Sequence, residues 1–300
     1  MIYIDNAATT RKKPKRVIFS AIKEMLLPAN AGRGGHRAGV RTAMKVEASR
    51  DAIRRNFFDG NVVFTKNCTE ALNIAINGLD LKGQVVTSIY EHNSVLRTLK
   101  RLELQKKINL NIIRPENGSL KAPLEKALKI KTAMVVLSGM SNVTGEILPI
   151  EELARFVKRN SNAIVLIDMA QSAGHKKFTH EDIDMIACSG HKGLHGLQGS
   201  GFLLFKRNMS APLPLITGGT GTSGNEIDIP KEVPEGLEAG TLNAIGAITL
   251  GKGIEYTFNK FDMINRRIER YTNIPCPKTT SPNPPSLSAN GSVEDTSLPA

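Results

Sequence analysis

A lysine and an aspartate that each follow an apolar run are the residues of this chain best suited to chemistry. Lys192 closes the segment Ser-Gly-His-Lys after the apolar run 183–188, and Asp168 closes the apolar run 163–167. A lysine amine in such a place can form a Schiff base with pyridoxal phosphate (PLP), and a carboxylate can keep the ring nitrogen of PLP protonated. The alternative interpretation is a surface loop lysine and an aspartate that only caps a turn.

Other polar residues are suited to the remaining groups of such a cofactor. Gln171, one turn after the aspartate, could bond the phenolic oxygen of the ring. The segment 67–70 follows an apolar run and opens a helical pattern, so its backbone N–H groups and the Thr69 hydroxyl could bind the phosphate. An ordinary helix cap explains this segment equally well. Ser189 and His191 add donors beside the lysine.

Two further loops and two cysteines complete the set of candidates. His92 could stack on the ring and transfer protons, because the reference pKa of histidine lies near neutrality, although a polar loop histidine is the alternative. Asn142 could contact the cofactor or the substrate. Cys68 lies at a predicted helix start, which could lower the pKa of its thiol, and we include it among the cofactor contacts. Cys188 fits a buried packing residue.

Two patterns that suggest other sites are set aside. His191 and His195 are four residues apart, but glycines at 190, 193 and 196 argue against a zinc-binding helix, and we expect no metal site. The glycine-rich segment 217–224 lacks the Lys-Ser/Thr ending of a phosphate loop and fits a mobile active-site loop better.

The elements that must position these residues alternate between strands and helices. Strand-like runs are predicted at 62–65, 84–88, 110–113, 133–138, 163–168, 184–189 and 201–205. Helical patterns are predicted at 42–57, 70–79, 94–104, 120–130 and 150–159. This alternation predicts an α/β fold with a mostly parallel central sheet and helices on both faces. Ligands of such sheets bind beyond the carboxyl ends of the strands, where Asp168 and Lys192 are expected.

Composition and charge narrow the class of protein. The 300 residues carry a net charge of +12, and residues 1–60 hold 13 Lys and Arg against five Asp and Glu. We interpret this as a basic surface around a site for anionic ligands, and nucleic-acid binding is disfavoured because only 5% of residues are aromatic and no recognisable motif is present. No apolar run is long enough to span a membrane. Three cysteines without paired spacing indicate a reducing cytoplasm.

Eight segments in this order along the chain resemble the class V aminotransferase superfamily of PLP fold type I, and most closely its cysteine desulfurase and selenocysteine lyase branch: 3–10, 32–39, 67–71, 91–94, 141–145, 168–175, 189–192 and 238–243. The resemblance implies a homodimeric enzyme that acts on L-cysteine or a related amino acid and yields alanine and enzyme-bound sulfur, with sulfur-acceptor proteins as possible partners. A selenocysteine lyase or another class V lyase or transaminase is the nearest alternative.

The resemblance also implies a role for each candidate residue. Lys192 would carry the cofactor, Asp168 would pair with the ring nitrogen, and His92 would stack on the ring. Gln171 and Asn142 would contact the ring oxygen or the substrate. The phosphate would be bound by Thr69, Ser189 and His191, and by Thr241 from the neighbouring subunit.

The resemblance further suggests a division of the chain into an N-terminal arm (1–15), a PLP-binding large domain (16–258), a helix that starts a small domain (259–273) and a disordered tail (274–300). In the family, the small domain carries the nucleophilic cysteine and an arginine that binds the substrate carboxylate. Cys276 lacks the surrounding motif of that cysteine. We therefore expect most of the small domain to be missing, and a truncated PLP-binding protein without turnover is a second hypothesis.

Overall fold

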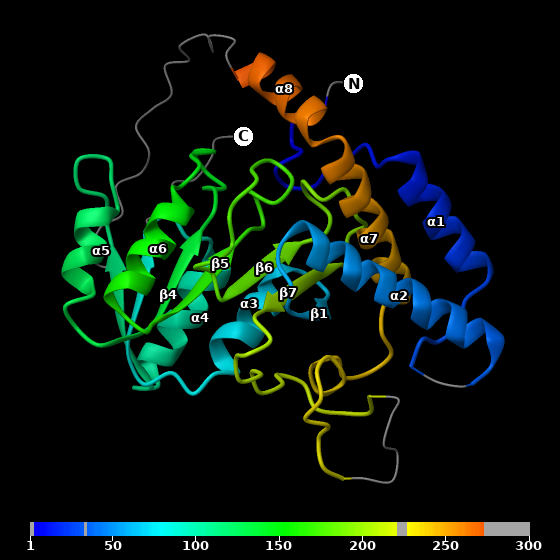
Figure 1. Ribbon diagram of the computed structural model, residues 1–300, viewed down its shortest axis with the longest axis horizontal. Helices are drawn as coiled ribbons and strands as arrows, with labels where there is room; N and C mark the ends of the chain where they lie inside the picture. The colour runs from blue at the N-terminus through cyan, green and yellow to red at the C-terminus, as the bar shows by residue number, and fades with distance from the viewer. Residues whose placement is uncertain (1–2, 33–34, 221–226, 273–300) are drawn as a thin grey trace, which may run out of the picture.

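A seven-stranded sheet in the order β1-β7-β6-β5-β4-β2-β3 forms the centre of the computed structural model, which describes residues 3–32, 35–220 and 227–272 (Figure 1). The strands are β1 (Asn61–Thr65), β2 (Gly83–Ser88), β3 (Ile108–Ile113), β4 (Thr132–Ser138), β5 (Ile164–Asp168), β6 (Met185–Ser189) and β7 (Gly201–Phe205). All seven predicted strands are present, and each begins and ends within two residues of its predicted bounds.

Four of the six strand pairings are parallel, which confirms the predicted mostly parallel sheet. Strands β3, β2, β4, β5 and β6 run in one direction, whereas β7 runs antiparallel to both β6 and β1. The reversal has a simple cause. Only residues 190–200 join β6 to β7, and a parallel crossover needs a dozen or more residues, usually including a helix.

Within the part of the chain that the structure describes, eight α-helices surround the sheet: α1 (Lys15–Leu26), α2 (Arg37–Asn56), α3 (Cys68–Asn77), α4 (Asn93–Leu104), α5 (Lys121–Ala127), α6 (Ile150–Asn160), α7 (Ala244–Asn259) and α8 (Phe261–Thr272). Helix α2 begins five residues before its predicted start, and α5 is shorter than predicted. Helices α1 and α7 were not predicted as helices. Pro14 at the start of α1 provides no side-chain cap, and α7, although Asn243 caps its start, contains three glycines that weaken its helical pattern.

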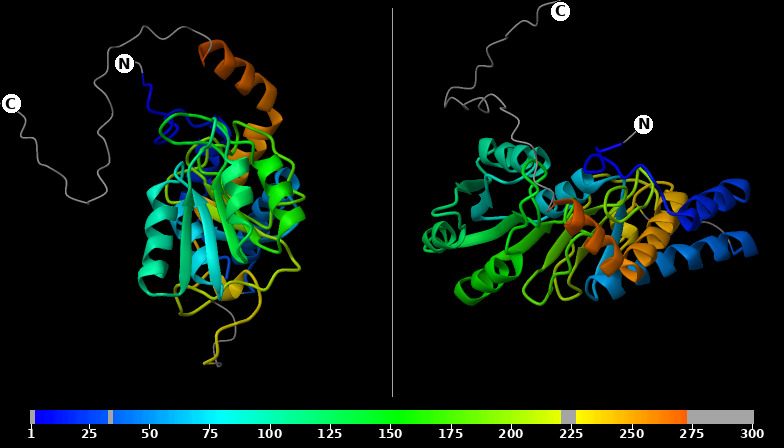
Figure 2. Two further views of the ribbon diagram at one scale, coloured as in Figure 1. Left: turned by 90° about the vertical axis from the view of Figure 1, so that its left-hand side faces the viewer. Right: turned by 90° about the horizontal axis from the view of Figure 1, so that it is seen from above.

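Helices cover both faces of the sheet, as expected (Figure 2). One apolar core joins the sheet to α2, α5, α6 and α7, and a second core joins its other face to α3 and α4. Alternate residues of β1 contribute to different cores, with Val62 and Phe64 in the first and Val63 in the second. Because both faces are buried, polar side chains are placed mainly at the strand ends, and Ser88, Ser138, Asp168 and Ser189 close four neighbouring parallel strands.

Part of the predicted domain organisation falls on residues that the structure does not describe. Helix α8 lies where a helix was expected at 259–273, but its assignment to a small domain stays a prediction. The tail 274–300, with Cys276, lies outside the described residues, as does part of the glycine-rich segment 217–224. Within the described ranges, no helix is long and apolar enough to cross a membrane.

Candidate active site

A pocket of about 520 Å³ opens at the carboxyl ends of β4, β5 and β6. It brings together nine of the ten candidate residues, namely Cys68, Thr69, His92, Asn142, Asp168, Gln171, Ser189, His191 and Lys192. The pocket walls come from five separate parts of the chain. Sequence reasoning could place these residues together because parallel strands end at one edge of the sheet.

Asp168 lies at the base of the pocket and is 4% exposed. Its Oδ1 accepts a hydrogen bond of 2.8 Å from the backbone N–H of Ala170 and one of 3.4 Å from the thiol of Cys68. Burial raises the pKa of Asp168, while these two hydrogen bonds and the neighbouring His92 and Lys192 side chains oppose the rise. A cation placed against Asp168 would offset the cost of its burial, which is what a protonated ring nitrogen provides.

The expected low pKa of Cys68 is wrong. Burial and the nearby Asp168 carboxylate raise the pKa of this thiol well above its ordinary value. Asn67, not Thr69, caps α3, because its Oδ1 accepts a 2.9 Å hydrogen bond from the N–H of Glu70. Cys68 is therefore the first residue of the helix, and its side chain is turned inward to Asp168. The pKa of Cys188 is likewise raised by burial, in agreement with a packing role.

The start of α3 and the end of β6 form a polar end of the pocket. The Ser189 side-chain oxygen is buried and has no hydrogen-bond partner among the described residues. A buried hydroxyl without a partner is costly, so it marks a position where a ligand oxygen would be stabilised. Thr69 and the N-terminal N–H groups of α3 lie at the same pocket, and helix N-termini favour phosphate. His191 stands beside them, with a pKa lowered by burial and by the charges of Lys192 and Lys13.

The backbone that carries Lys192 is held by the N-terminal arm. Thr10 donates from its hydroxyl to the Lys192 carbonyl at 2.7 Å and from its N–H to the His191 carbonyl at 3.1 Å. Lys13 donates to the His191 carbonyl at 2.8 Å. Burial lowers the pKa of Lys13 to about 8. Sequence reasoning missed both residues, because Lys13 belongs to a basic cluster that was interpreted as solvated surface.

A close backbone approach explains one of the glycines beside the lysine. A side chain at Gly193 would place its Cβ 2.2 Å from the carbonyl oxygen of Ala173. Glycine therefore lets the turn after Lys192 pack directly against the segment that follows Asp168. The expectation that no helix joins His191 to His195 is confirmed, since this segment forms turns and His195 bonds Thr257 at 3.0 Å.

His92 is fixed at the start of α4. Its Nδ1 accepts a 3.1 Å hydrogen bond from the N–H of Ser94, so the neutral ring carries its proton on Nε2. The preceding residue, Glu91, was not among the candidates. It is 6% exposed and accepts hydrogen bonds of 2.6 Å from the hydroxyls of Ser88 and Ser138, which end β2 and β4. Burial raises the pKa of Glu91 to about 7 despite these bonds.

The last two pocket candidates come from loops, and one candidate lies elsewhere. Gln171 donates from its amide to the carbonyl of Ala7 at 3.2 Å, so the N-terminal arm reaches the pocket again. Asn142 lines the pocket from the loop after β4. Thr241 does not line it; this residue faces a second cavity of about 750 Å³ between the end of β1 and the loop 237–243. Among the described residues, no group of His, Cys, Asp and Glu is arranged to hold a metal ion.

Comparison with known proteins agrees with this geometry. The profile of the class V aminotransferases matches residues 2–273 of the chain. The chain belongs to the class V aminotransferase family. A probable cysteine desulfurase of Pyrococcus abyssi is 40% identical to this class V aminotransferase over 85% of the chain and 67% of the relative. A probable cysteine desulfurase of Methanothermobacter thermautotrophicus is 32% identical over 90% of the chain and 69% of the relative.

A solved structure gives the same result for the fold. The apo structure of the cysteine desulfurase from Thermococcus onnurineus superposes with a TM-score of 0.81 at 33% identity, over 90% of this chain and 72% of that one. The resemblance to cysteine desulfurases and the PLP fold type I architecture are thus confirmed, and so is the interpretation as a cysteine desulfurase-like enzyme. The class V aminotransferase described here spans about two thirds of the length of the relatives it matches.

Proposed function

We propose that the pocket binds PLP and that the enzyme releases sulfur from L-cysteine, with alanine as the other product. One observation supports this most: the buried Asp168 at the end of β5, and Lys192 with the Ser189 hydroxyl, unpartnered among the described residues, at the end of β6, face one pocket. The choice of cysteine as the substrate is supported by relatives that are named probable cysteine desulfurases. Selenocysteine is the alternative substrate that the same pocket chemistry would accept.

The residues of the pocket fit the parts of PLP. Thr69, Ser189 and His191 would hold the phosphate at the N-terminus of α3. Asp168 would pair with the ring nitrogen at the base of the pocket. Gln171 and Asn142 would reach the phenolic oxygen or the substrate, as the sequence predicts. PLP, when bound, supplies an electron sink for negative charge at the α-carbon of an amino acid.

Each of three side chains would then have its own task. Lys192 would hold the cofactor and, once displaced by the substrate amine, would remove the α-proton with its neutral amine. Asp168 would remain ionised opposite the positive ring nitrogen, because the paired charges favour that state in a buried site. His92, whose orientation is fixed by Ser94, would lie beside the ring and present its Nε2–H as a donor.

The sulfur-accepting thiol is not one of the two described cysteines. Cys68 and Cys188 are 8% and 0% exposed, and burial raises the pKa of both thiols, so neither forms the thiolate that takes sulfur. Cys276 lies outside the described residues. A PLP-binding protein without turnover stays the second hypothesis. Homodimer formation, delivery of sulfur to acceptor proteins and a cytoplasmic location also stay predictions.

Two measurements test the proposal. Added PLP should give the purified protein the visible absorbance band of lysine-linked PLP, and Lys192→Ala should lose this band while keeping the circular dichroism of a folded protein. Incubation with L-cysteine and an added dithiol reductant, which supplies the two electrons that turn bound sulfur into sulfide, should then release alanine and sulfide in equal amounts. A wild-type protein that shows no absorbance band would refute the proposal, and a band without alanine would select the function without turnover.

A further inference from the structure

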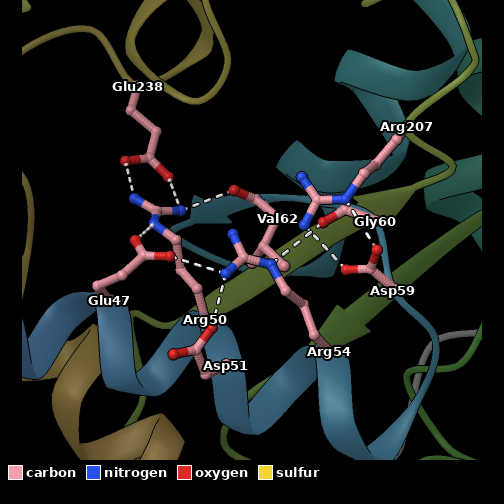
Figure 3. Close-up of polar contacts among 9 residues, drawn as sticks. All are labelled: Glu47, Arg50, Asp51, Arg54, Asp59, Gly60, Val62, Arg207 and Glu238. Carbon is pink, nitrogen blue, oxygen red and sulfur yellow. Dashed lines mark hydrogen bonds and ion pairs between the residues drawn. The ribbon is translucent and has the colours of Figure 1, made fainter.

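A buried ion pair joins α2 to the loop that precedes α7 (Figure 3), and neither of its residues lines the cofactor pocket. The guanidinium of Arg50 donates to both carboxylate oxygens of Glu238, at 2.9 and 2.7 Å. The two side chains are only 4% and 9% exposed. Two-point pairing of this kind fixes the orientation as well as the separation of the groups.

The same pair also binds the outer edge of β1. Strand β1 ends the sheet, and among the described residues no strand pairs with its other side. Arg50 donates to the carbonyl of Val62 at 2.7 Å, and Glu238 accepts from the N–H of Phe64 at 2.6 Å. The ion pair thus offers one donor and one acceptor to residues i and i+2, as a neighbouring strand would. The Arg50 guanidinium also lies 4.5 Å from the centre of the Phe64 ring.

Within a few residues of Phe64 and of Glu238, the chain reaches segments that line the cofactor pocket or contact the loop after Lys192. Three residues after Phe64, the chain reaches Asn67 and the start of α3, where Thr69 and the helix N–H groups would hold the phosphate. Five residues after Glu238, the Asn243 side chain donates to the carbonyl of Gly199 at 2.9 Å, in the connection that follows Lys192. The ion pair is therefore placed to set the spacing between the start of α3 and the loop 237–243.

A second ion pair in the same region has the same two-point geometry but is not buried. Arg207 bonds Asp59 with the same two-point geometry, at 2.9 Å for each contact, but these side chains are 56% and 70% exposed (Figure 3). Exposed ion pairs contribute little to the free energy of unfolding. A buried ion pair often adds little net stability as well, because its charges lose their hydration, and its main effect is then to fix the geometry of the groups that it joins.

We propose that Arg50 and Glu238 are positioning residues that hold the start of α3 in the orientation needed to bind the cofactor phosphate. Neither residue lines the cofactor pocket, so the effect acts through the backbone of β1 and the segment 65–67. This inference rests on the proposed PLP site.

The test compares two variants of the pair with a control. Glu238→Ala should weaken PLP binding about tenfold, because a small displacement of a binding group has effects of this size or larger. The ³¹P NMR resonance of the bound phosphate should also shift. Since Glu238→Ala leaves the buried Arg50 with only the largely exposed Glu47 as an ionic partner and could unfold the protein, Arg50→Met/Glu238→Leu provides a variant without this buried charge. Asp59→Asn, at the exposed pair, should leave both measurements unchanged.

A second readout does not depend on the cofactor. In the protein without PLP, hydrogen exchange of the backbone amides at the start of α3 should become faster in both variants of the pair and stay unchanged in Asp59→Asn. Folded variants with wild-type PLP affinity, phosphate resonance and exchange rates would overturn the inference. If the wild-type protein fails to bind PLP, the proposed function fails, while the exchange rates still decide whether the ion pair positions the helix start.

Discussion

Replacing the buried Glu91 by glutamine should change how the stability of the protein depends on pH. Glu91 is 6% exposed, and burial raises its pKa from 4.5 to about 7. Between these two values the folded protein keeps a proton on Glu91 that the unfolded chain has released. The wild-type protein therefore loses stability as the pH rises through this window, and the loss is complete slightly above pH 7.

The size of the effect follows from the pKa difference. A shift of about 2.5 pKa units corresponds to about 3 kcal/mol of unfolding free energy, of which about 2 kcal/mol is lost between pH 5.5 and pH 8. Glutamine is neutral at every pH and can still hydrogen bond to the hydroxyls of Ser88 and Ser138. Glu91→Gln should thus gain about 2 kcal/mol relative to the wild type when the pH is raised from 5.5 to 8.

Urea denaturation of both proteins at the two pH values measures this change. The difference in unfolding free energy between variant and wild type is compared at pH 5.5 and pH 8. Contributions from all other titrating groups are present in both proteins and therefore largely cancel. Glu125→Gln, an exposed substitution on α5, is the matched control and should show no comparable gain. A stability difference between Glu91→Gln and wild type that is the same at pH 5.5 and pH 8 would refute the reasoning, because Glu91 would then have an ordinary pKa in the folded state.

Three further outcomes are expected. Thr10→Val removes the hydroxyl that bonds the carbonyl of Lys192 and should weaken PLP binding about fivefold, as one lost hydrogen bond of about 1 kcal/mol predicts; titration with PLP measures it. Cys68 and Cys188 should react with a thiol reagent at pH 8 only after unfolding, and rapid labelling of either in the folded protein, mapped by mass spectrometry, would contradict their burial. Gly193→Ala should destabilise the fold by about 2 kcal/mol in urea because of its 2.2 Å clash with a carbonyl oxygen, whereas Gly218→Ala, with nothing within 4 Å, should have little effect.

The strands and most of the pocket could be predicted because their signals are local. A continuous apolar run that ends in a polar residue identifies a buried parallel strand and its carboxyl end, and this placed Asp168 and Ser189 correctly. Helix α7 gave no such signal, since it is buried on most sides. Its Gly251 would place a Cβ 2.4 Å from the Ser49 hydroxyl oxygen, so the glycine that weakens the helix signal is required by packing against α2.

What the sequence could not show is which distant residues support the site. Thr10 and Lys13 are 182 and 178 residues away from the residues whose carbonyls they bond, and no periodicity links them. Glu91 looked like an ordinary loop residue because its two serine partners come from different strands. The low pKa expected for Cys68 was wrong for a similar reason. A helix start favours the thiolate, but burial beside Asp168 has the larger effect, and burial is decided by tertiary packing.

The position of β1 at the sheet edge affects how the chain must fold. This strand is made early in synthesis, yet its pairing partner β7 follows about 140 residues later, from Asn61 to Phe205, and Glu238 later still. Until then, its apolar segment from Val62 to Phe64 has no partner, and such unpaired strands are prone to association with other chains. The high sequence separation also predicts slow folding. The nascent chain should therefore depend on chaperones until β7 has emerged from the ribosome.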